Sequence, residues 1–394
     1  MSPVTSVATP PDLLAPDERR VIDDFHRDIW CLLGLPIDAS TTPQTLDQLY
    51  LRIIDPLEQS PLGCFLTTPN LNFVIAALRD PTFRESVINS DWVVADGMPL
   101  VWVAQALNVP ITERIAGSSL IDKLRFESGP DRRPLRIFFF GGPDGVAKTA
   151  CEQLEREHLG LEGAGYCSPG FGSIESMSTD EIIDSINASE ADIVLVALGA
   201  KRGQAWIEYN RSRLKAPAIS HLGAVVNFVA GTVTRAPLWM QRSGTEWLWR
   251  IYEERNLLKR YWSDGLRFLH LYVTRVRPYQ KFIQARAAAH KPTKAEVRLT
   301  EEGDHLLKIH LTGSLIHAQL ADIRVAFCRA ALAKRDIELD LGACSDIDPA
   351  FIGQLLLLRK YQNSHNKRLR INGVDKWRKD VFRYNCVEYL LQRS

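Results

Sequence analysis

The sequence predicts an α/β protein with two folded units: a larger one with a mostly parallel sheet, and a smaller one at the carboxy terminus. Short apolar runs alternate with amphipathic stretches over residues 32–218, as in repeated strand-helix units. Residues 288–294 read AAHKPTK, a composition typical of a linker. A shorter series of strand and helix patterns follows, which indicates a second domain over residues 295–394.

Composition sets the broad class. The chain has 394 residues, enough for two or three domains of about 100–200 residues each. Hydrophobic residues make up 45% and charged residues 24%, as in ordinary globular proteins. The formal net charge of +1 gives no overall attraction for nucleic acid, so no nucleic-acid partner is expected. The seven cysteines are scattered without a C-x-x-C pair, which disfavours a zinc site and a disulfide framework.

Residues 1–31 are predicted to be an amino-terminal extension. Their first part is rich in Pro, Ser and Thr and is expected to be disordered, whereas residues 17–33 have helical apolar spacing and are expected to dock on the core. The extension lacks the basic and apolar regions of a signal peptide. Because no apolar run approaches the ~20 residues that a membrane span needs, we expect a cytoplasmic protein that meets a membrane from one side only.

Strands are predicted next, each followed by a polar or glycine-containing turn and then a helix. Such a Rossmann-like sheet binds ligands beyond the carboxyl ends of its strands. The expected strands cover residues 64–66, 92–94, 135–140 and 192–198. The residues expected at the carboxyl edge of the sheet are Thr68, Asn70, Asp96, Gly141, Gly142 and Gly199.

Residues 248–294 are aromatic and basic. Asp264 is the only acidic residue after Glu254 in this segment. A solvated helical surface that packs on the core would explain the pattern. Adsorption on anionic lipid, to which each nearby basic residue contributes about 1 kcal/mol, would explain it equally. The basic residues after Glu254 are Arg255, Lys259, Arg260, Arg267, Arg275, Arg277, Lys281, Arg286, Lys291 and Lys294.

The carboxy-terminal unit is predicted to alternate strands and helices. Its expected strands cover residues 305–311, 337–341 and 368–371. Its expected helices cover residues 319–334, 349–361 and 376–391. This order predicts a small α/β domain with at least three strands.

Five short motifs follow one another along the larger unit: TPN at 68–70, ADG at 95–97, RIAG at 114–117, RAPLW at 235–239 and EWLWR at 246–250. Together they resemble the WecG/TagA/CpsF family of bacterial glycosyltransferases (glycosyltransferase family 26). The resemblance implies an inverting, metal-independent enzyme without a cofactor. Such an enzyme moves a sugar from a UDP-sugar to a polyprenyl-diphosphate-linked sugar.

The resemblance implies that Asp96 is the catalytic base. A carboxylate within hydrogen-bond reach can take the proton of an acceptor hydroxyl. Asp before Gly also commonly stabilises a turn, which is the structural alternative. Thr68 and Asn70 are expected to position substrate beside the base, although both residue types also cap helices.

Arginines are the candidate phosphate ligands, because guanidinium groups pair with phosphate oxygens in bidentate geometry. Arg114 suits a diphosphate, and a surface ion pair with Glu113 or another nearby acid is its structural alternative. The resemblance implies that the carboxy-terminal part of the transferase closes over the active site with further arginines, for which Arg235, Arg250 and Arg260 are the candidates.

Glycine-rich turns offer weaker signals. Backbone amides of Gly141 and Gly142 could face a nucleotide phosphate. The stretch GGPDGVAKT lacks the glycine that precedes the lysine of a P-loop, and no G-x-G-x-x-G occurs. The Asp-x-Asp pair at 346–348 lies far from the other motifs and is interpreted as accidental, so that no metal site is predicted.

The sequence departs from the family at several positions. The family pattern Gly-x-Pro-Lys-Gln-Glu before a Trp reads GAKRGQAW at 199–206, so that Gly203 replaces the functional Gln. A slip of one residue would let Gln204 serve instead. Asn227 stands where the family favours Asp, and Ser119 replaces another usual Asp. An unusual donor sugar or weakened catalysis would follow from these changes.

The carboxy-terminal unit resembles a STAS domain, the fold of bacterial anti-sigma-factor antagonists. The matching stretches are LTG at 311–313 and LDL at 339–341, followed by DID at 346–348. In the regulatory relatives a phosphorylatable Ser follows the Asp, but Pro349 and Ala350 follow Asp348 here. We therefore expect a docking module that recruits a protein partner, and we expect truncation near Lys294 to leave the transferase folded.

The leading hypothesis is a UDP-sugar-dependent glycosyltransferase of residues 32–247. It would transfer a hexose or N-acetylhexosamine, of N-acetylmannosamine type by family, in exopolysaccharide or other cell-surface glycan synthesis. Residues 248–294 would bring it to the inner face of the cytoplasmic membrane. The rival hypothesis, from another class, is a catalytically weakened scaffold that binds nucleotide-sugar or glycolipid and recruits a partner through its STAS-like domain. A third hypothesis is a nucleotide-binding oxidoreductase.

Overall fold

The larger unit is built on a six-stranded sheet in which all neighbouring strands are parallel. The strand order is β4-β3-β8-β7-β5-β6. The strands are β3 (Cys64–Thr67), β4 (Trp92–Val93), β5 (Leu135–Gly141), β6 (Leu161–Cys167), β7 (Ile193–Ala197) and β8 (Ala218–His221). The predicted parallel α/β sheet is thereby confirmed. The computed structural model describes residues 16–55, 62–126, 132–237, 239–240, 244–253, 257–289 and 291–392.

Two strands of this sheet, β6 and β8, were not predicted from the sequence. β6 contains Gly163 and Gly165 and is mostly half-exposed, so it lacks an apolar pattern. β8 has four residues and ends in the polar pair Ser220-His221, although all four are buried. Burial by neighbouring elements, rather than local pattern, makes both segments strands.

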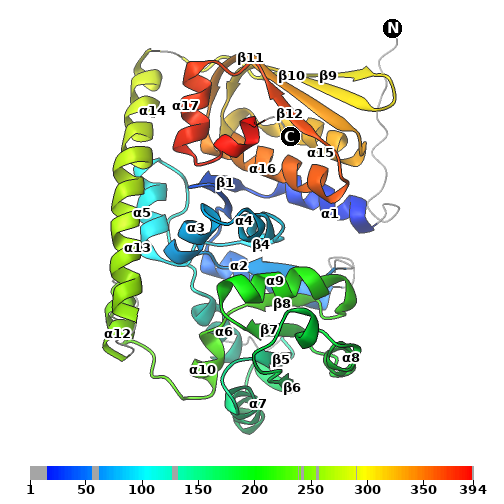
Figure 1. The fold of residues 1–394 in the computed structure, drawn as a ribbon, viewed down its shortest axis with the longest axis vertical. Coiled ribbons are helices and arrows are strands. Elements are labelled where there is room, and N and C mark those ends of the chain that lie inside the picture. Colours follow the sequence, from blue (N-terminus) through cyan, green and yellow to red (C-terminus); the bar gives the residue numbers. More distant parts are fainter. Residues whose placement is uncertain are drawn as a thin grey trace.

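Helices cover the sheet and its edges (Figure 1). Several begin with a side-chain cap, as Asn70 caps α3 by accepting a hydrogen bond from the amide of Phe73. The helices of this unit are α2 (Thr42–Ile54), α3 (Leu71–Ala77), α4 (Pro81–Ile88), α5 (Met98–Ala106), α6 (Gly117–Phe126), α7 (Val146–Glu157), α8 (Asp180–Ala188), α9 (Ala200–Asn210) and α10 (Val225–Val229).

The amino-terminal segment differs from its prediction. Helix α1 (Pro16–His26) ends early, and β1 (Ile29–Leu32) then pairs antiparallel with β2 (Leu35–Asp38). Leu33 and Gly34 form the turn with positive φ angles of 49° and 89°. The prediction of a helix over 17–33 was wrong in its last part because a short, fully buried apolar run does not distinguish helix from strand. The predicted disorder of the first residues lies outside the described part of the chain.

The carboxy-terminal unit has a four-stranded sheet in the order β12-β11-β10-β9, with β9 antiparallel to β10 and the other pairs parallel. The prediction missed β9, and α17 ends before the predicted residue 391, with a 3₁₀ turn over Glu388–Leu391. The elements are β9 (Glu296–Glu302), β10 (Leu306–Leu315), α15 (Ala321–Leu332), β11 (Asp336–Ile347), α16 (Pro349–Ser364), β12 (Leu369–Asn372) and α17 (Lys376–Tyr384).

A long helical segment runs beside both units (Figure 1). It begins with α12 (Glu246–Glu253), continues through α13 (Leu257–Leu271) and a π-helical turn (Tyr272–Val276), and ends with α14 (Arg277–Ala289). This is the segment that the sequence marks as aromatic and basic. None of the helices that the structure describes has the length and apolarity to cross a membrane.

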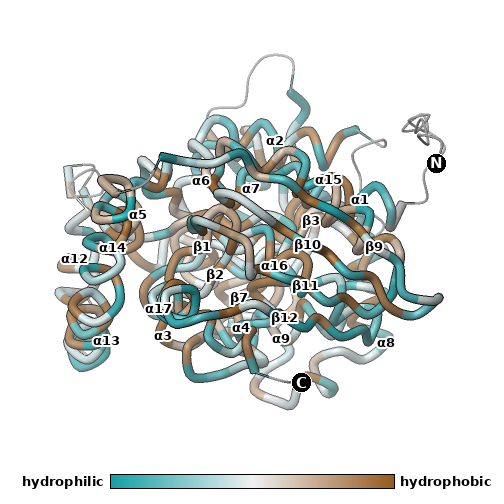
Figure 2. The backbone as a smooth tube through the Cα atoms, turned by 90° about the horizontal axis from the view of Figure 1, so that it is seen from above, coloured by the Kyte–Doolittle hydropathy of each residue, from teal (hydrophilic) through white to brown (hydrophobic). Residues whose placement is uncertain are grey.

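One hydrophobic cluster spans both units. Buried side chains of α1 and β1, such as Phe25 and Ile29, belong to the same cluster as Phe327 and Phe351 of the carboxy-terminal unit. A Cβ added to Gly353 of α16 would lie 2.8 Å from the carbonyl oxygen of Ile29, so the helix and β1 are in close backbone contact. Figure 2 shows apolar segments of β1, β2 and α16 gathered in the middle of the molecule.

A buried ionic cluster crosses the same interface. Lys360 of α16 donates to Asp24 of α1 at 2.7 Å and lies 3.6 Å from Asp91, and all three side chains are about 4% exposed. Arg20 donates to Asp91 at 2.7 Å, and Arg211 also pairs with it. Burial alone would raise the pKa of Asp91, but these cations hold it well below its usual range. Asp24 and Asp91 of the larger unit are therefore neutralised in part by Lys360 of the carboxy-terminal unit.

Candidate functional site

The polar turns predicted to meet at one edge of the sheet do so. Thr68 and Asn70 follow β3, and Asp96 follows the neighbouring strand β4. The amide of Asp96 donates to the carbonyl of Pro69 at 2.8 Å, which ties the two turns together. Thr68 is buried, and Asn70 caps α3, so one of the structural alternatives weighed for these residues is observed.

Asp96 lies at the entrance of the turn that starts α5. Gly97 follows with a φ of 132°, a conformation that favours glycine, and serves as the N-cap of α5 without a side-chain hydrogen bond. The Asp96 side chain is 27% exposed, so a substrate hydroxyl can reach its carboxylate. The turn therefore holds a carboxylate at the carboxyl edge of the sheet, where general-base chemistry would need it.

Arg114 lies beside Asp96. Its Nη1 is 4.0 Å from Oδ1 of Asp96 and donates to Oε2 of Glu246 at 2.8 Å. The amide of Ile115 donates to the carbonyl of Ala95 at 2.8 Å and fixes this loop against the Asp96 turn. The structural alternative of an ion pair with a nearby acid is therefore observed, with Glu246 rather than with Glu113, because Glu113 accepts from the backbone amide of Thr42 at 2.6 Å.

Glu246 was not identified from the sequence as a site residue. It begins α12, far along the chain, and its side chain is 10% exposed. Its position in the EWLWR motif could have marked it as a site residue. The motif does not show that Glu246 contacts Arg114, because that contact depends on how α12 packs. The ion pair with this carboxylate holds the Arg114 side chain in place. Removal of Glu246 would leave the charge of Arg114 without its partner, which is destabilising for a buried pair.

These polar groups open into a pocket of about 500 Å³ between α3, α5, α12 and α13. Its polar part contains Asn70, Asp96, Arg114 and Glu246. Asp264 of α13 also lines it and accepts from Nδ2 of Asn72 at 3.2 Å, which joins α13 to α3. The other walls are mainly apolar: Met98, Pro99, Trp102, Trp247, Ile251, Leu258, Tyr261, Trp262, Leu266 and Phe268.

The remaining candidate arginines lie in different places. Arg260 of α13 lines the pocket. Arg235 pairs with Asp122 and donates to Oγ of Ser119 at 2.7 Å, so it is held against α6. Ser119, which replaces a usual Asp, is thus a partner of Arg235. The side chain of Arg250 lies outside the described part of the structure.

The glycine turns lie farther along the same edge. Gly141 ends β5 and Gly142 follows it, with φ angles of 89° and 88°, and the amide of Gly142 donates to the carbonyl of Ala197 of β7 at 2.9 Å. A Cβ on Gly141 would come within 2.9 Å of the same carbonyl, so backbone packing alone requires glycine there. Gly199 begins α9 next to them as its N-cap.

Two candidate binding residues do not line the Asp96 pocket. Gln204 is fully buried, and its Nε2 donates to Oγ1 of Thr67 at 3.0 Å. This placement argues against direct substrate contact and against Gln204 as a replacement for the glutamine missing at position 203. Asn227 lies half-buried on α10, where its backbone carbonyl accepts from the amide of Thr232 at 3.0 Å.

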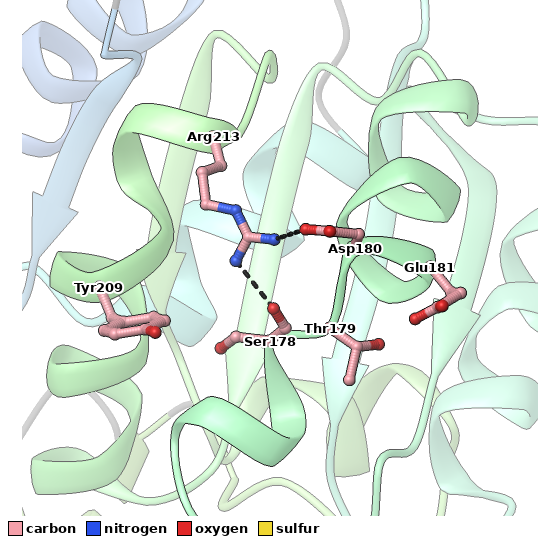
Figure 3. A pocket seen from close by; sticks show the side chains of 6 residues that line it. All are labelled: Ser178, Thr179, Asp180, Glu181, Tyr209 and Arg213. Atoms are coloured by element: carbon pink, nitrogen blue, oxygen red, sulfur yellow. Dashed lines mark hydrogen bonds and ion pairs between the residues drawn. The ribbon is translucent and has the colours of Figure 1, made fainter.

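A second pocket of about 670 Å³ lies between α8, α9 and the turn after α9. Figure 3 shows Arg213 directed toward Asp180 and Ser178 in it. Arg213 donates to Asp180 at 2.6 Å and to the carbonyl of Ser178 at 2.8 Å. Its cation is thus paired, and the acidic residues Asp180 and Glu181 disfavour a phosphate ligand. No group of three or more His, Cys, Asp or Glu side chains suited to a metal ion was found over the described ranges.

Comparisons with known proteins match each unit to a known family. A sequence model of the glycosyl transferase WecG/TagA/CpsF family matches residues 30–281, and a model of the Mlab STAS domain matches residues 297–392. Both resemblances proposed from the motifs are thereby confirmed.

Three relatives are named N-acetylglucosaminyldiphosphoundecaprenol N-acetyl-beta-D-mannosaminyltransferase. The protein of Bacillus spizizenii strain W23 is 30% identical over 189 residues, which cover 48% of this chain and 71% of the relative. That of Bacillus subtilis strain 168 is 27% identical over 55% of this chain and 81% of the relative. That of Staphylococcus aureus strain NCTC 8325 is 22% identical over 56% and 82%. The chain therefore belongs to the WecG/TagA/CpsF family of glycosyltransferases and carries a STAS domain at its carboxy terminus.

Proposed function

We propose that the protein transfers an N-acetylhexosamine, of N-acetylmannosamine type, from a UDP-sugar to a polyprenyl-diphosphate-linked sugar. The product would serve exopolysaccharide or other cell-surface glycan synthesis. The observation that carries the proposal is the pocket in which Asp96 and Arg114 face mainly apolar walls of α5, α12 and α13. The acceptor consists of a sugar, a diphosphate and a polyprenyl chain. It therefore needs a site with a base for the sugar hydroxyl, a cation for the diphosphate and apolar walls for the chain. The names of the relatives favour the same acceptor class.

The proposed chemistry is a single displacement. The acceptor hydroxyl attacks the anomeric carbon while its proton passes to the carboxylate of Asp96. The bond from the anomeric carbon to the diphosphate oxygen breaks, and UDP leaves with that electron pair. Attack from the face opposite the leaving group inverts the anomeric configuration. Thr68 and Asn70 lie beside the base. The candidate phosphate ligands are Arg114, Arg235, Arg250 and Arg260.

Metal independence is part of the proposal. Cationic side chains and backbone amides at the sheet edge, rather than a metal ion, stabilise the leaving diphosphate. Turnover in the presence of excess EDTA should therefore equal turnover without it. Loss of activity in EDTA that Mg²⁺ or Mn²⁺ restores would contradict this part of the proposal.

The proposal is tested by identifying the product. The purified protein would receive UDP-N-acetylmannosamine, its gluco and galacto analogues and undecaprenyl-diphosphate-linked GlcNAc in detergent. Mass spectrometry should find the acceptor heavier by one N-acetylhexosamine, and proton NMR should find a β linkage from an α-linked donor. UDP binding without a heavier product from any donor would instead favour the scaffold hypothesis, which the missing glutamine at position 203 motivates.

We also propose that α13 brings the protein to a membrane surface. Leu258, Trp262, Leu266 and Leu269 recur at helical spacing, and each is more than half exposed. Lys259, Arg260 and Arg267 lie on the same helix and would attract anionic lipid. The apolar surface continues from the walls of the acceptor pocket, so a polyprenyl chain could pass directly from lipid to the site.

Vesicle flotation tests this surface. The wild type should float with vesicles that contain about one-third anionic phospholipid, and the variant with Trp262, Leu266 and Leu269 all changed to serine should stay at the bottom. Val325→Ser is the matched control, because Val325 is an exposed apolar residue of the other unit. Equal flotation of the triple variant and the wild type would contradict a membrane role for α13.

A further inference from the structure

The space that a side chain at position 203 would occupy is filled by His221. A Cβ added to Gly203 would lie 2.1 Å from Cδ2 and 3.0 Å from Nε2 of the imidazole ring. Gly203 belongs to the first turn of α9, whereas His221 ends β8. Position 203 of α9 thus has no side chain, and the imidazole ring of His221 from β8 occupies the space instead.

The ring of His221 is buried and unpaired. Residue 221 is 9% exposed, and neither Nδ1 nor Nε2 has a hydrogen-bond partner among the described residues. An imidazole that only filled space would lose the free energy of its hydrogen bonds to water, and a phenylalanine would fill the same space without that cost. Burial lowers the pKa of His221 to about 4, so the ring is neutral at pH 7 and can donate one hydrogen bond.

The ring lies beside the amino terminus of α9. Gly199 begins this helix of eleven residues with a φ of 77° and without a side-chain cap. The amide of Gly203 donates to Gly199 at 2.7 Å, but those of residues 200–202 have no intrahelical acceptor. A Cβ on Gly223, the neighbour of the ring, would lie 3.3 Å from Nε2 and 4.0 Å from the amide nitrogen of Gly199. Glycines at positions 199, 203 and 223 therefore keep side chains away from the ring and the helix end.

The order of the strands in the sheet gives the approximate distance between His221 and the proposed base, Asp96. β8 is the neighbour of β3, which bears Thr68 and Asn70, and β3 is the neighbour of β4, which bears Asp96. Two strand spacings amount to about 10 Å, within the length of a nucleotide sugar. His221 lies on the side of β3 opposite Asp96 and Arg114, and it does not line the apolar pocket.

We propose that Nε2 of His221, together with the first amides of α9, donates hydrogen bonds to a phosphate oxygen of the nucleotide-sugar donor. A helix amino terminus with free amides favours an anion, and a neutral imidazole supplies a directed donor. Arg114, beside the apolar pocket, is then left for the diphosphate of the lipid-linked acceptor. This inference rests on the proposed function, since it assigns a residue to the donor half of the same site.

The test measures donor binding and donor kinetics separately. His221→Phe keeps a ring and removes both nitrogens, and His305→Phe changes a histidine of the other unit as a control. Calorimetry with UDP should give a Kd about tenfold or more above wild type for His221→Phe, as expected for one lost hydrogen bond to a charged group, and no change for His305→Phe. The KM for the donor should rise to a similar extent, while the KM for the acceptor should stay within about twofold.

A relocation variant makes the test sharper. Gly203→Gln alone should weaken UDP binding, because its Cβ displaces the ring. Gly203→Gln combined with His221→Gly returns a polar side chain to the helix and should bind UDP more tightly than either single change. If His221→Phe does not fold, a ¹⁵N NMR spectrum of wild type labelled at histidine takes its place, and UDP should shift the ring nitrogens of His221.

The outcomes separate this inference from the proposed function. UDP binding that is equal in wild type and folded His221→Phe, or ring nitrogens that do not respond to UDP, would overturn the role of His221 and leave the transferase proposal intact. UDP binding that depends on His221 without sugar transfer would support the inference and overturn the transferase proposal. A wild type that binds no uridine nucleotide would overturn both.

Discussion

Replacing Asp96 with asparagine should lower kcat by at least about tenfold, and by ~10²–10⁴-fold if the carboxylate makes a full general-base contribution. The substitution keeps the shape of the side chain but removes its ability to take a proton. Because the amide of Asp96 holds the turn through Pro69, the backbone should stay in place. The KM values should change less than kcat, since the proton moves only in the transition state.

A neighbouring carboxylate supplies the control for Asp96. Glu113 adjoins Arg114 in the chain, but its side chain is directed to Thr42. Glu113→Gln should therefore retain wild-type kcat when assayed in parallel. A folded Asp96→Asn protein with unchanged kcat would show that Asp96 is not the base and would leave the turn with a structural role only.

Deletion of residues 295–394 should prevent the transferase from folding as a soluble, cooperatively melting domain. This reverses the expectation from the sequence, which placed a self-contained unit behind a linker. The deletion would expose the face of β1 and β2 that α16 covers and would remove the side chains that share a core with Phe25 and Ile29. Asp24 and Asp91 would also lose Lys360, their cation from α16. Soluble expression with a single cooperative thermal transition would contradict this prediction.

A point substitution tests the same interface without deletion. Lys360→Ala should destabilise the whole protein by ~3–5 kcal/mol, the usual cost of removing one partner of a buried ion pair. Lys379→Ala, on the exposed face of α17, is the matched control and should leave the melting temperature unchanged. A wild-type melting temperature for Lys360→Ala would show that the cluster does not hold the two units together.

This packing also bears on the role of the STAS domain. The sequence indicated a module that recruits a partner, yet α16 and α17 lie against the transferase itself. Arg359 pairs with Glu85 at 3.4 Å, and the ring of Trp30 stacks on His317 with centroids 4.9 Å apart. A partner of this domain would therefore have to bind the surfaces that the transferase leaves open, of which the sheet face that bears Lys308 and Glu338 is one.

The carboxyl edge of the sheet was predictable because local signals mark it. A buried strand followed by a polar turn places Thr68, Asn70 and Asp96 at one edge whatever the rest of the chain does. The opposite wall of the pocket was not predictable in this way. Glu246 meets Arg114 only because α12 and α13 fold back over α3 and α5, and no local pattern specifies that contact.

Contacts in the protein interior also could not be predicted from local sequence patterns. The apolar run at 29–32 shows that a segment is buried but does not show what covers it, and its partner α16 lies more than 300 residues away. Gly203 shows a related effect. The sequence shows a missing side chain at this position, and only the structure shows that His221, on another element, occupies the space.

The most direct test of the account is acceptor-dependent release of UDP by wild type and Asp96→Asn. Each protein would be given UDP-N-acetylmannosamine with and without undecaprenyl-diphosphate-linked GlcNAc, and UDP would be measured over time. We predict release by the wild type that requires the acceptor and that Asp96→Asn reduces at least about tenfold. Release that does not depend on the acceptor, or that the substitution leaves unchanged, would contradict the assignment of this site as the centre of sugar transfer.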